Sequence, residues 1–209
     1  DSIEVLNNYI ILEDFDGSKI DIDRKSEREK LGVEEDDFVL GYAGRLSKEK
    51  GCEHLINAMP HLPKNCKLLV AGTGDEQAKL ETLIKNHKIN ERVSLLGFVK
   101  KIREFYTLID CLVIPSEHES FGLIAIEAQA LGIPVIASNI PGLNEVAVDQ
   151  ESGILFERKN SEDLAEKIKL IMNDDELRNK LISGGLENVK QYNIQAYYDL
   201  MIEQYSKLM

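Results

Sequence analysis

Five short apolar runs alternate along the chain with segments that have helical periodicity. The runs are rich in Val, Ile and Leu, and they lie at residues 38–44, 66–72, 92–98, 111–115 and 134–138. Several are apolar at consecutive positions, which is typical of parallel strands that are covered on both faces. The pattern therefore predicts five strands of one parallel sheet.

The segments between these runs have the spacing of amphipathic helices. After the first run, apolar residues recur at positions i, i+3, i+4 and i+7, as Cys52, Leu55, Ile56 and Met59. Residues 80–84 repeat part of this pattern, and residues 101–110 and 121–132 fill the next two gaps. Strands that alternate with helices of this length form βαβ units. We therefore expect an α/β fold, a Rossmann-like open parallel sheet with helices on both faces.

The pattern changes at both ends of the chain. Three consecutive helices without an intervening strand are predicted near the end, at residues 160–172, 174–185 and 193–209. Asn173 with Glu176 resembles a capping box for the second of them. Near the start, residues 2–12 are compatible with a strand and a turn, and residues 13–23 form an acidic connector. We expect a connector at 1–24, a central domain at 25–192 and an added C-terminal helix at 193–209.

Composition narrows the function classes. The 209 residues include 25 Lys or Arg and 37 Asp or Glu, which gives a net charge of −12. This balance argues against a nucleic-acid surface, which needs clustered cations, and against electrostatic docking on anionic lipid. We see neither a signal peptide nor an apolar run long enough to span a bilayer.

Cysteine usage points to a reducing compartment. Cys52, Cys66 and Cys111 are scattered along the chain and form no C-x-x-C pair. A disulfide framework or a zinc site is therefore not expected. We expect a reduced, cytoplasmic location, because disulfides are rare there.

A pair of glycines, Gly72 and Gly74, follows the second predicted strand. The dinucleotide-binding fingerprint G-x-G-x-x-G/A needs glycine or alanine at its last position, but Gln77 stands there. We therefore interpret the two glycines as shaping a strand-to-helix turn rather than binding NAD.

Two cations, Arg45 and Lys50, follow the first predicted strand, where a helix is expected to begin. Free N–H groups at a helix N-terminus and two neighbouring cations make an anion site that suits phosphate groups. The alternative at this point is that both side chains are ordinary solvated charges.

Two carboxylates flank a glycine in the segment EHESFGLIAIE, residues 117–127. Glu127 lies in an apolar run, where a carboxylate is costly unless it is paired, and Glu119 precedes Gly122 near the predicted helix start. A glycosidase pair needs carboxyl groups about 5–9.5 Å apart, whereas eight residues of helix span about 12 Å. A longer ligand fits better, with a phosphate at the helix N-terminus and hydroxyl-bearing rings on both sides. A nucleotide sugar matches this description.

Several motifs follow one another along nearly the whole chain: GRLSKEKG, LLVAGTG, VSLLGFV, DCLVIPSEHESFGLIAIEAQALGIPVIAS, PGLNEV and SGILF. Together they resemble the C-terminal, donor-binding half of a family 4 retaining glycosyltransferase with the GT-B fold. The resemblance implies binding of a UDP-sugar or GDP-sugar, from which the intact enzyme moves a hexose to a saccharide or lipid-linked acceptor. Such transfer serves polysaccharide or glycoconjugate biosynthesis. The resemblance implies no metal and no other cofactor.

The resemblance assigns roles to the charged residues. Arg45 and Lys50 would bind the donor diphosphate and stabilise the leaving group as its negative charge develops. Glu119 would contact hydroxyls of the donor sugar, and Glu127 would hold the ribose hydroxyls. No residue of this half is expected to be the catalytic group.

Backbone groups would complete the donor site. The amides of Gly122 and Leu123 would contact the diphosphate, and Ser120 and Phe121 would lie beside the donor sugar. The base would contact the backbone of three consecutive residues, Phe98, Val99 and Lys100.

Three positions depart from the family pattern. Pro141 stands where the family often has the first glycine of a Gly-Gly pair, and Ser120 stands where glycine is common. Asn8 follows Asn7 in place of the usual glycine. None of these departures removes a charged donor contact, but each could tune the choice of sugar.

The acceptor-binding N-terminal domain of this family has no counterpart in the chain. The last helix, 193–209, resembles the one that packs back across both domains. We therefore expect the chain alone to bind nucleotide but to transfer sugar poorly, and we expect any contact with the inner face of a membrane to come from the missing domain. Two alternatives remain: a non-catalytic nucleotide-sugar-binding module, or another GT-B enzyme such as an epimerase or a phosphorylase.

Other polar residues near these motifs are interpreted as ordinary. Glu117 and His118 are expected to be solvated loop residues, and Asp110 is expected to close a helical turn. Glu145 is equally compatible with the site and with a helix cap. Glu127 has one structural alternative, a buried ion pair with Arg or Lys.

Overall fold

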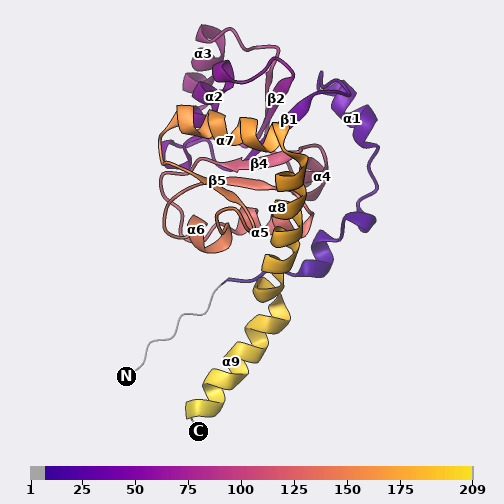
Figure 1. The fold of residues 1–209 in the computed structure, drawn as a ribbon, viewed down its shortest axis with the longest axis vertical. Helices are drawn as coiled ribbons and strands as arrows, with labels where there is room; N and C mark the ends of the chain where they lie inside the picture. The colour runs from indigo at the N-terminus through magenta and orange to yellow at the C-terminus, as the bar shows by residue number, and fades with distance from the viewer. Residues whose placement is uncertain (1–7, 209) are drawn as a thin grey trace.

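A six-stranded sheet forms the centre of the molecule (Figure 1). The computed structural model describes residues 8–208. The strands are β1 (Phe38–Ala43), β2 (Cys66–Ala71), β3 (Val93–Gly97), β4 (Cys111–Ile114), β5 (Val135–Ser138) and β6 (Ile154–Phe156). They lie in the order β3-β2-β1-β4-β5-β6, and every neighbouring pair is parallel.

The five strands predicted from the apolar runs are confirmed, each to within one residue at either end. The sequence pattern does not predict β6, which has three residues. A hydrophobic period is not visible over so short a run. The segment is a strand because it pairs with β5, with Ile154 beside Ile136 and Phe156 beside Ser138.

Helices connect the strands and cover both faces of the sheet. The α-helices are α1 (Arg24–Lys30), α2 (Cys52–Ala58), α3 (Gln77–Asn86), α4 (Ile102–Thr107), α5 (Leu123–Ala130), α6 (Leu143–Val146), α7 (Ser161–Asn173), α8 (Asp175–Asn188) and α9 (Ile194–Leu208). Short 3-10 turns are η1 (Leu12–Phe15), η2 (Gly17–Lys19), η3 (Lys48–Lys50), η4 (Met59–His61) and η5 (Val189–Tyr192). The helices predicted near the C-terminus are confirmed as α7, α8 and α9.

The predicted capping box at Asn173 is wrong. Asn173 is the last residue of α7, and Asp174 is the N-cap of α8. The side chain of Asp174 accepts a hydrogen bond of 2.8 Å from the amide of Leu177. Asp and Asn are both strong N-cap residues, so the sequence leaves the choice between these neighbours open.

Two apolar clusters cover the two faces of the sheet. In β1, Leu40 and Tyr42 join the cluster that includes α2, α3 and α7, whereas Val39 and Ala43 join the cluster that includes α4, α5 and α6. Successive strand residues point to opposite faces, so both faces are buried. This arrangement explains why the strand sequences lack the polar alternation of a half-exposed sheet.

The N-terminal segment is fixed to the start of the last helix. The amide of Ile10 donates to the carbonyl of Tyr192 at 2.9 Å, and the amide of Ile194 donates back to Ile10 at 3.1 Å. The rings of Tyr9 and Tyr197 lie 4.7 Å apart. The strand and turn proposed for residues 2–12 fall partly outside the described residues, and Asn7 lies there too. The acidic connector at 13–23 contains most of η1 and all of η2.

Asp110 has a larger role than closing a helical turn, so that expectation is wrong. Its carboxylate accepts a hydrogen bond of 2.7 Å from the amide of Val39 in β1. It also forms ion pairs with Arg24 at 2.6 Å and with Arg28 at 2.8 Å. Burial lowers the pKa of Arg28, and the neighbouring Asp110 opposes that shift. Asp110 therefore connects α1 to the amino-terminal edge of the sheet.

The described part of the chain, residues 8–208, has no helix whose length and hydropathy suit a membrane span. The three cysteines are all free and buried, in agreement with the expectation that they form no disulfide.

Replacing Asp110 with alanine is expected to lower the free energy of unfolding by about 3 kcal/mol, because Arg28 would stay buried without its anion. This figure is at the low end for buried pairs because the Asp110 side chain keeps 22% of its exposure. Urea denaturation measures the change. The control Asp36→Ala removes an exposed carboxylate nearby and should change stability by less than about 0.5 kcal/mol. Equal losses in the two variants would contradict the role of Asp110.

Candidate functional site

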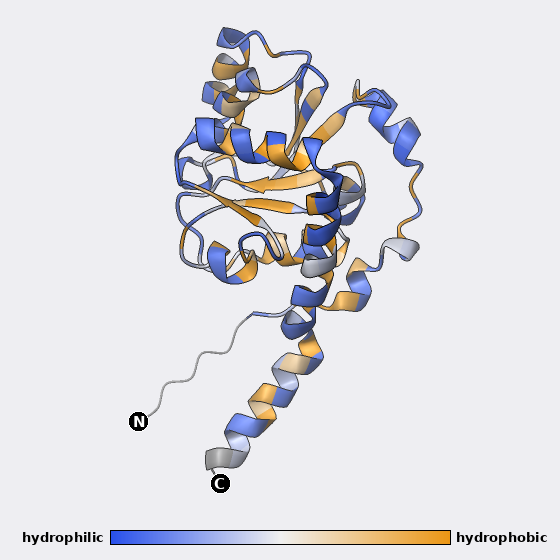
Figure 2. Cartoon of the chain, viewed as in Figure 1, coloured by the Kyte–Doolittle hydropathy of each residue, from blue (hydrophilic) through white to orange (hydrophobic). Residues whose placement is uncertain are grey.

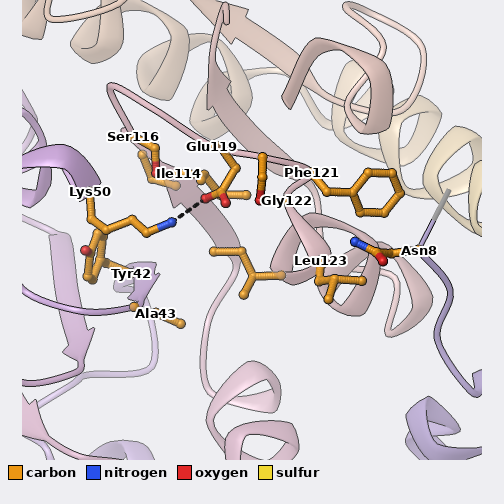
Figure 3. A pocket seen from close by; sticks show the side chains of 14 residues that line it. Asn8, Tyr42, Ala43, Lys50, Ile114, Ser116, Glu119, Phe121, Gly122 and Leu123 are labelled. Atoms are coloured by element: carbon orange, nitrogen blue, oxygen red, sulfur yellow. Dashed lines mark hydrogen bonds and ion pairs between the residues drawn. The ribbon is translucent and has the colours of Figure 1, made fainter. Parts of the chain in front are cut away.

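A hollow lies where the order of the strands reverses. The chain passes from β1 outward through β2 to β3, and then returns to β4 on the other side of β1. In open parallel sheets, ligands bind beyond the carboxyl ends of the strands at such a switch point. The hollow at this place has a volume of about 200 Å³ (Figure 3). Its lining residues are Asn8, Tyr42, Ala43, Gly44, Lys50, Val113, Ile114, Ser116, Glu119, Ser120, Phe121, Gly122, Leu123 and Ile124.

A second hollow of about 390 Å³ adjoins the first. The two share Ala43, Gly44 and Ile124. The remaining lining of the second hollow comes from Arg45, Ala71, Gly72, Thr73, Phe98, Val99 and Ile102. Sites for small organic ligands usually enclose about 300–1,000 Å³. The two hollows together therefore offer room for an elongated ligand that lies across the ends of β4, β1 and β2.

The structure gathers most of the predicted site residues in these two hollows. The first contains the predicted residues Lys50, Glu119, Ser120, Phe121, Gly122 and Leu123. The second contains the predicted residues Arg45, Phe98 and Val99. Glu127 and Lys100 line neither hollow. The two groups differ in their position along the sheet. The first lies at the carboxyl ends of β1 and β4, and the second lies toward β2 and β3.

Lys50 and Glu119 form the central ion pair of the first hollow. The Nζ atom of Lys50 lies 2.7 Å from Oε2 of Glu119 (Figure 3). Lys50 is the last residue of η3, and Glu119 belongs to the loop between β4 and α5. Their side chains are 28% and 14% exposed. An ion pair thus joins two residues that are far apart in the sequence and that both line the first hollow.

Arg45 presents its charge to the second hollow. Among the described residues, no carboxylate lies within ion-pair distance of its guanidinium group. The hydroxyl of Tyr42 donates a hydrogen bond of 2.8 Å to the carbonyl of Arg45, which fixes the backbone at the end of β1. An exposed arginine without an anion is available to bind one.

The N-terminus of α5 faces the first hollow. Gly122 is its N-cap, with φ of 90° and ψ of 44°, and no side chain caps the helix there. The left-handed conformation favours glycine, and an added Cβ would lie 2.6 Å from Cδ2 of Leu143. Because the first N–H groups of an α-helix lack intrahelical partners, this helix end can bind an anion.

Glu127 lies one helical turn beyond Leu123, the first residue of α5. Its Oε2 accepts a hydrogen bond of 2.9 Å from the hydroxyl of Tyr106, which is fully buried. The alternative of an ion pair with Arg or Lys is wrong, because no cation within residues 8–208 pairs with Glu127. Burial raises the pKa of Glu127, and the Tyr106 hydrogen bond only partly offsets this effect.

Glu117 is buried, so its interpretation as a solvated loop residue is wrong. Its carboxylate lies 2.7 Å from Nζ of Lys159 and 3.1 Å from Nε2 of His54. Its amide donates to the carbonyl of Glu49 at 2.7 Å. Burial raises the pKa of this carboxyl group, but the bonds from Lys159 and His54 outweigh burial and lower it overall. Glu117 therefore connects its own loop to η3, to α2 and to the loop between β6 and α7.

No local pattern in the sequence indicates these contacts of Glu117. His54 and Lys159 are more than forty residues from Glu117 in opposite directions, and neither belongs to a recognisable motif. The alternation of charged and polar residues at 116–120 resembles any exposed loop.

Glu53, His54 and Glu117 have ligand atoms within 4.8 Å of one another, a spacing that could hold a metal ion. The two carboxylates already have cationic partners, however. Glu53 pairs with Lys79 and Glu117 pairs with Lys159. The negative charges of both carboxylates are therefore neutralised by lysine side chains.

Gly72 and Gly74 lie between β2 and α3, where the sequence predicts a strand-to-helix turn. The structure adds that both glycines allow this turn to approach the loop after β1 closely. An added Cβ on Gly72 would lie 1.8 Å from the carbonyl oxygen of Gly44, and one on Gly74 would lie 2.3 Å from that of Leu46. The loops after β1 and β2 therefore pack backbone against backbone.

Two further residues are placed by the structure. His118 is exposed and lines a hollow next to Glu119, together with Pro141 and Arg158. Glu145 lies within the first turn of α6, whose N-cap is Gly142. The capping alternative for Glu145 is therefore wrong.

Replacing Glu117 with glutamine is expected to lower the free energy of unfolding at pH 7 by about 1.5–3 kcal/mol, the range for hydrogen bonds to charged groups. Because the folded pKa of Glu117 is lowered, its contribution is fully present above the unfolded pKa and disappears as pH falls through the folded pKa. Urea denaturation at pH 7 and near pH 3 measures both values. The control Glu104→Gln removes an exposed carboxylate paired with Lys101 and should cost less than about 1 kcal/mol. A Glu117 effect that does not change with pH would contradict this assignment.

Comparison with known proteins places the chain in a family. The sequence model of glycosyl transferases group 1 matches residues 23–187. An uncharacterised glycosyltransferase of Methanocaldococcus jannaschii is 33% identical over 193 residues, which are 90% of this chain and 50% of that protein. The chain spans about half the length of the curated relatives it matches.

Solved structures share the fold. Anabaena HepE in complex with UDP and glucose is similar with a TM-score of 0.88 and 26% identity, over 97% of this chain and 56% of that chain. The C-terminal domain of the group 1 protein LpcC from Francisella tularensis is similar with a TM-score of 0.77 and 27% identity. That match covers 88% of this chain and 99% of the LpcC domain. The chain belongs to the glycosyl transferases group 1 family and has the Rossmann-like fold of one half of a GT-B glycosyltransferase.

Proposed function

We propose that the chain is the donor-binding half of a retaining glycosyltransferase. In the whole enzyme, a hexose would pass from a UDP-sugar or GDP-sugar to a saccharide or lipid-linked acceptor, as in polysaccharide or glycoconjugate biosynthesis. The observation that carries the proposal is the convergence of Lys50, Glu119 and the N-terminus of α5 in one hollow at the switch point of the sheet. The complex of the similar HepE with UDP and glucose supports the same ligand class.

The diphosphate would lie between the cations and the helix end. Lys50 faces the first hollow and Arg45 the second, so a diphosphate across their shared wall could contact both. The free amides at Gly122 and Leu123 would complete its surroundings. Negative charge builds on the diphosphate as the sugar leaves, and preorganised positive groups stabilise that charge. Lys50, Arg45 and the helix amides would stabilise the departing diphosphate without a metal ion.

The remaining parts of the donor would extend to either side. Glu119 would accept hydrogen bonds from sugar hydroxyls, beside Ser120 and Phe121. Glu127 would accept from the ribose hydroxyls while Tyr106 holds its carboxylate in place. The base would lie in the second hollow, near the backbone of Phe98, Val99 and Lys100. The side chain of Phe98 is 79% exposed, which leaves its ring free to cover a base.

We propose that the last helix contacts the other half of the enzyme. Helix α9 projects away from the sheet, and apolar residues lie along its length (Figure 2). Tyr198, Leu200, Ile202 and Tyr205 are between 39% and 64% exposed. Exposed apolar faces of this kind mark protein contacts. The acceptor site and the catalytic groups would belong to that other half.

Calorimetric titration with UDP, GDP and ADP tests donor binding. We expect one of the three to bind, and we expect Arg45→Ala to weaken that binding by tenfold or more, because a charged hydrogen bond to phosphate contributes about 1.5–3 kcal/mol. The control Lys180→Ala removes an exposed cation on α8 and should leave the affinity unchanged. Similar weak binding of all three nucleotides, unaffected by Arg45→Ala, would indicate only a general anion site.

The same samples test the division of labour between the two halves. With a nucleotide sugar and a saccharide acceptor, the chain alone is expected to transfer little sugar. Robust transfer would contradict the assignment of the catalytic groups to the other half.

Glu127→Gln is expected to weaken nucleotide binding by about tenfold or more, because charged acceptors form the stronger hydrogen bonds. Stability at pH 7 should not fall. The folded pKa of Glu127 is raised, so the ionised carboxylate costs folding free energy at pH 7, and the wild type gains stability over the variant as pH falls through that pKa. Titration calorimetry and urea denaturation at pH 7 and pH 5 measure the two effects.

A matched control is Glu166→Gln, which removes an exposed carboxylate on α7 and should change neither property. If Glu127→Gln lowered stability as strongly as binding, Glu127 would be a structural residue rather than a ligand contact.

A further inference from the structure

The ion pair between Lys50 and Glu119 joins two residues that the donor would need separately. Under the proposed function, Lys50 binds the diphosphate and Glu119 binds the sugar. In the structure their charged atoms lie 2.7 Å apart, with side chains only 28% and 14% exposed (Figure 3). Each residue is therefore satisfied by the other before any donor arrives.

Neither residue has a second partner of opposite charge. Within residues 8–208, Lys50 is the sole cation within ion-pair distance of Glu119, and Glu119 is the sole carboxylate within that distance of Lys50. A negatively charged diphosphate that takes Lys50 consequently removes the one cation that neutralises Glu119.

The surrounding backbone is held in place while this exchange occurs. The amide of Glu117 donates to the carbonyl of Glu49 at 2.7 Å, next to Lys50 on one side and near Glu119 on the other. The buried carboxylate of Glu117 is held by Lys159 and His54. The exchange can therefore proceed by rotation of two side chains, without rearrangement of the loops.

The cost of the exchange depends on what the ligand carries. A nucleoside diphosphate takes Lys50 and offers Glu119 no replacement, so a mostly buried carboxylate is left unpaired beside a phosphate of the same charge. Leaving a mostly buried carboxylate without a partner costs free energy. A nucleotide sugar supplies hydroxyl donors to the freed carboxylate, which offsets the loss of the ion pair.

We propose that the Lys50–Glu119 pair makes the site discriminate between the intact nucleotide sugar and the nucleoside diphosphate that remains after transfer. This inference rests on the proposed function. Glu119 favours binding of the donor, because hydroxyls of the sugar replace the ion pair that Glu119 loses when the diphosphate binds Lys50. After transfer it competes with the diphosphate for Lys50 and promotes release of that product.

The test compares the affinities of wild type and Glu119→Gln for a diphosphate and its sugar. UDP and UDP-glucose are used, or GDP and GDP-mannose, or ADP and ADP-glucose, as the base preference directs. Glutamine keeps the shape and one acceptor oxygen but has no charge to hold Lys50. We expect Glu119→Gln to bind the diphosphate several-fold more tightly and the nucleotide sugar less tightly. The ratio of the two dissociation constants should shift by about tenfold.

A background without Lys50 separates exchange from simple repulsion. Removing a negative charge near an anion could tighten binding without any ion pair. If the pair is the cause, Glu119→Gln tightens diphosphate binding in the wild type but not in a Lys50→Met background, as a double-mutant cycle reveals. Equal tightening in both backgrounds would overturn the exchange.

A control variant addresses stability. Asp37→Asn removes a buried carboxylate that lies 3.8 Å from Lys67, at the opposite end of β1. It should leave both affinities unchanged, and thermal denaturation confirms that each variant is folded.

The outcomes separate the two proposals. Binding of both ligands with an unchanged ratio, or equal weakening of both by Glu119→Gln, would overturn the discrimination alone. Absence of binding by either ligand to wild type and to Glu119→Gln would overturn the donor site and the discrimination together.

Discussion

The parallel pairing of β1 with β4 is the constraint on which the candidate site depends. These strands are neighbours in the sheet but are separated in sequence by β2 and β3. Because the chain leaves them in opposite directions, the loops that follow them diverge and leave a hollow at their carboxyl ends. Lys50 and Glu119, sixty-nine residues apart, meet above that hollow. No local propensity could bring them together.

Four carboxylates in buried or partly buried positions fall into two groups, which differ in the number of partners that each carboxylate has. Asp110 and Glu117 each have more than one partner, and each connects segments that are distant in sequence. Glu119 has one cationic partner, and Glu127 has the hydroxyl of Tyr106. The first kind holds the fold, because several bonds would have to break together. The second kind keeps acceptor capacity that a ligand can use, at a cost in folding free energy.

Strands with a local apolar pattern were predicted correctly from the sequence, whereas contacts between distant segments were not. Long apolar runs gave the five strands because a buried parallel strand has a pattern that is local and continuous. The three residues of β6 lack such a pattern and depend on pairing with β5. Glu117 was taken for a solvated residue because its partners are distant in sequence: His54 belongs to α2, and Lys159 belongs to the loop between β6 and α7. Asp110 was misjudged for the same reason, since Arg24 and Arg28 are more than eighty residues away.

The sequence by itself determined the class of fold, most of the helices and strands, and the residues that gather around the switch point. Hydrophobic periodicity and motif order depend on residues that are close in sequence, so both can be recognised from the sequence alone. The tertiary structure alone decided which charges satisfy one another. It paired Lys50 with Glu119, placed the hydroxyl of Tyr106 against Glu127, and buried Glu117 between Lys159 and His54. Electrostatic energy depends on distance and burial, and both are set by how distant segments pack.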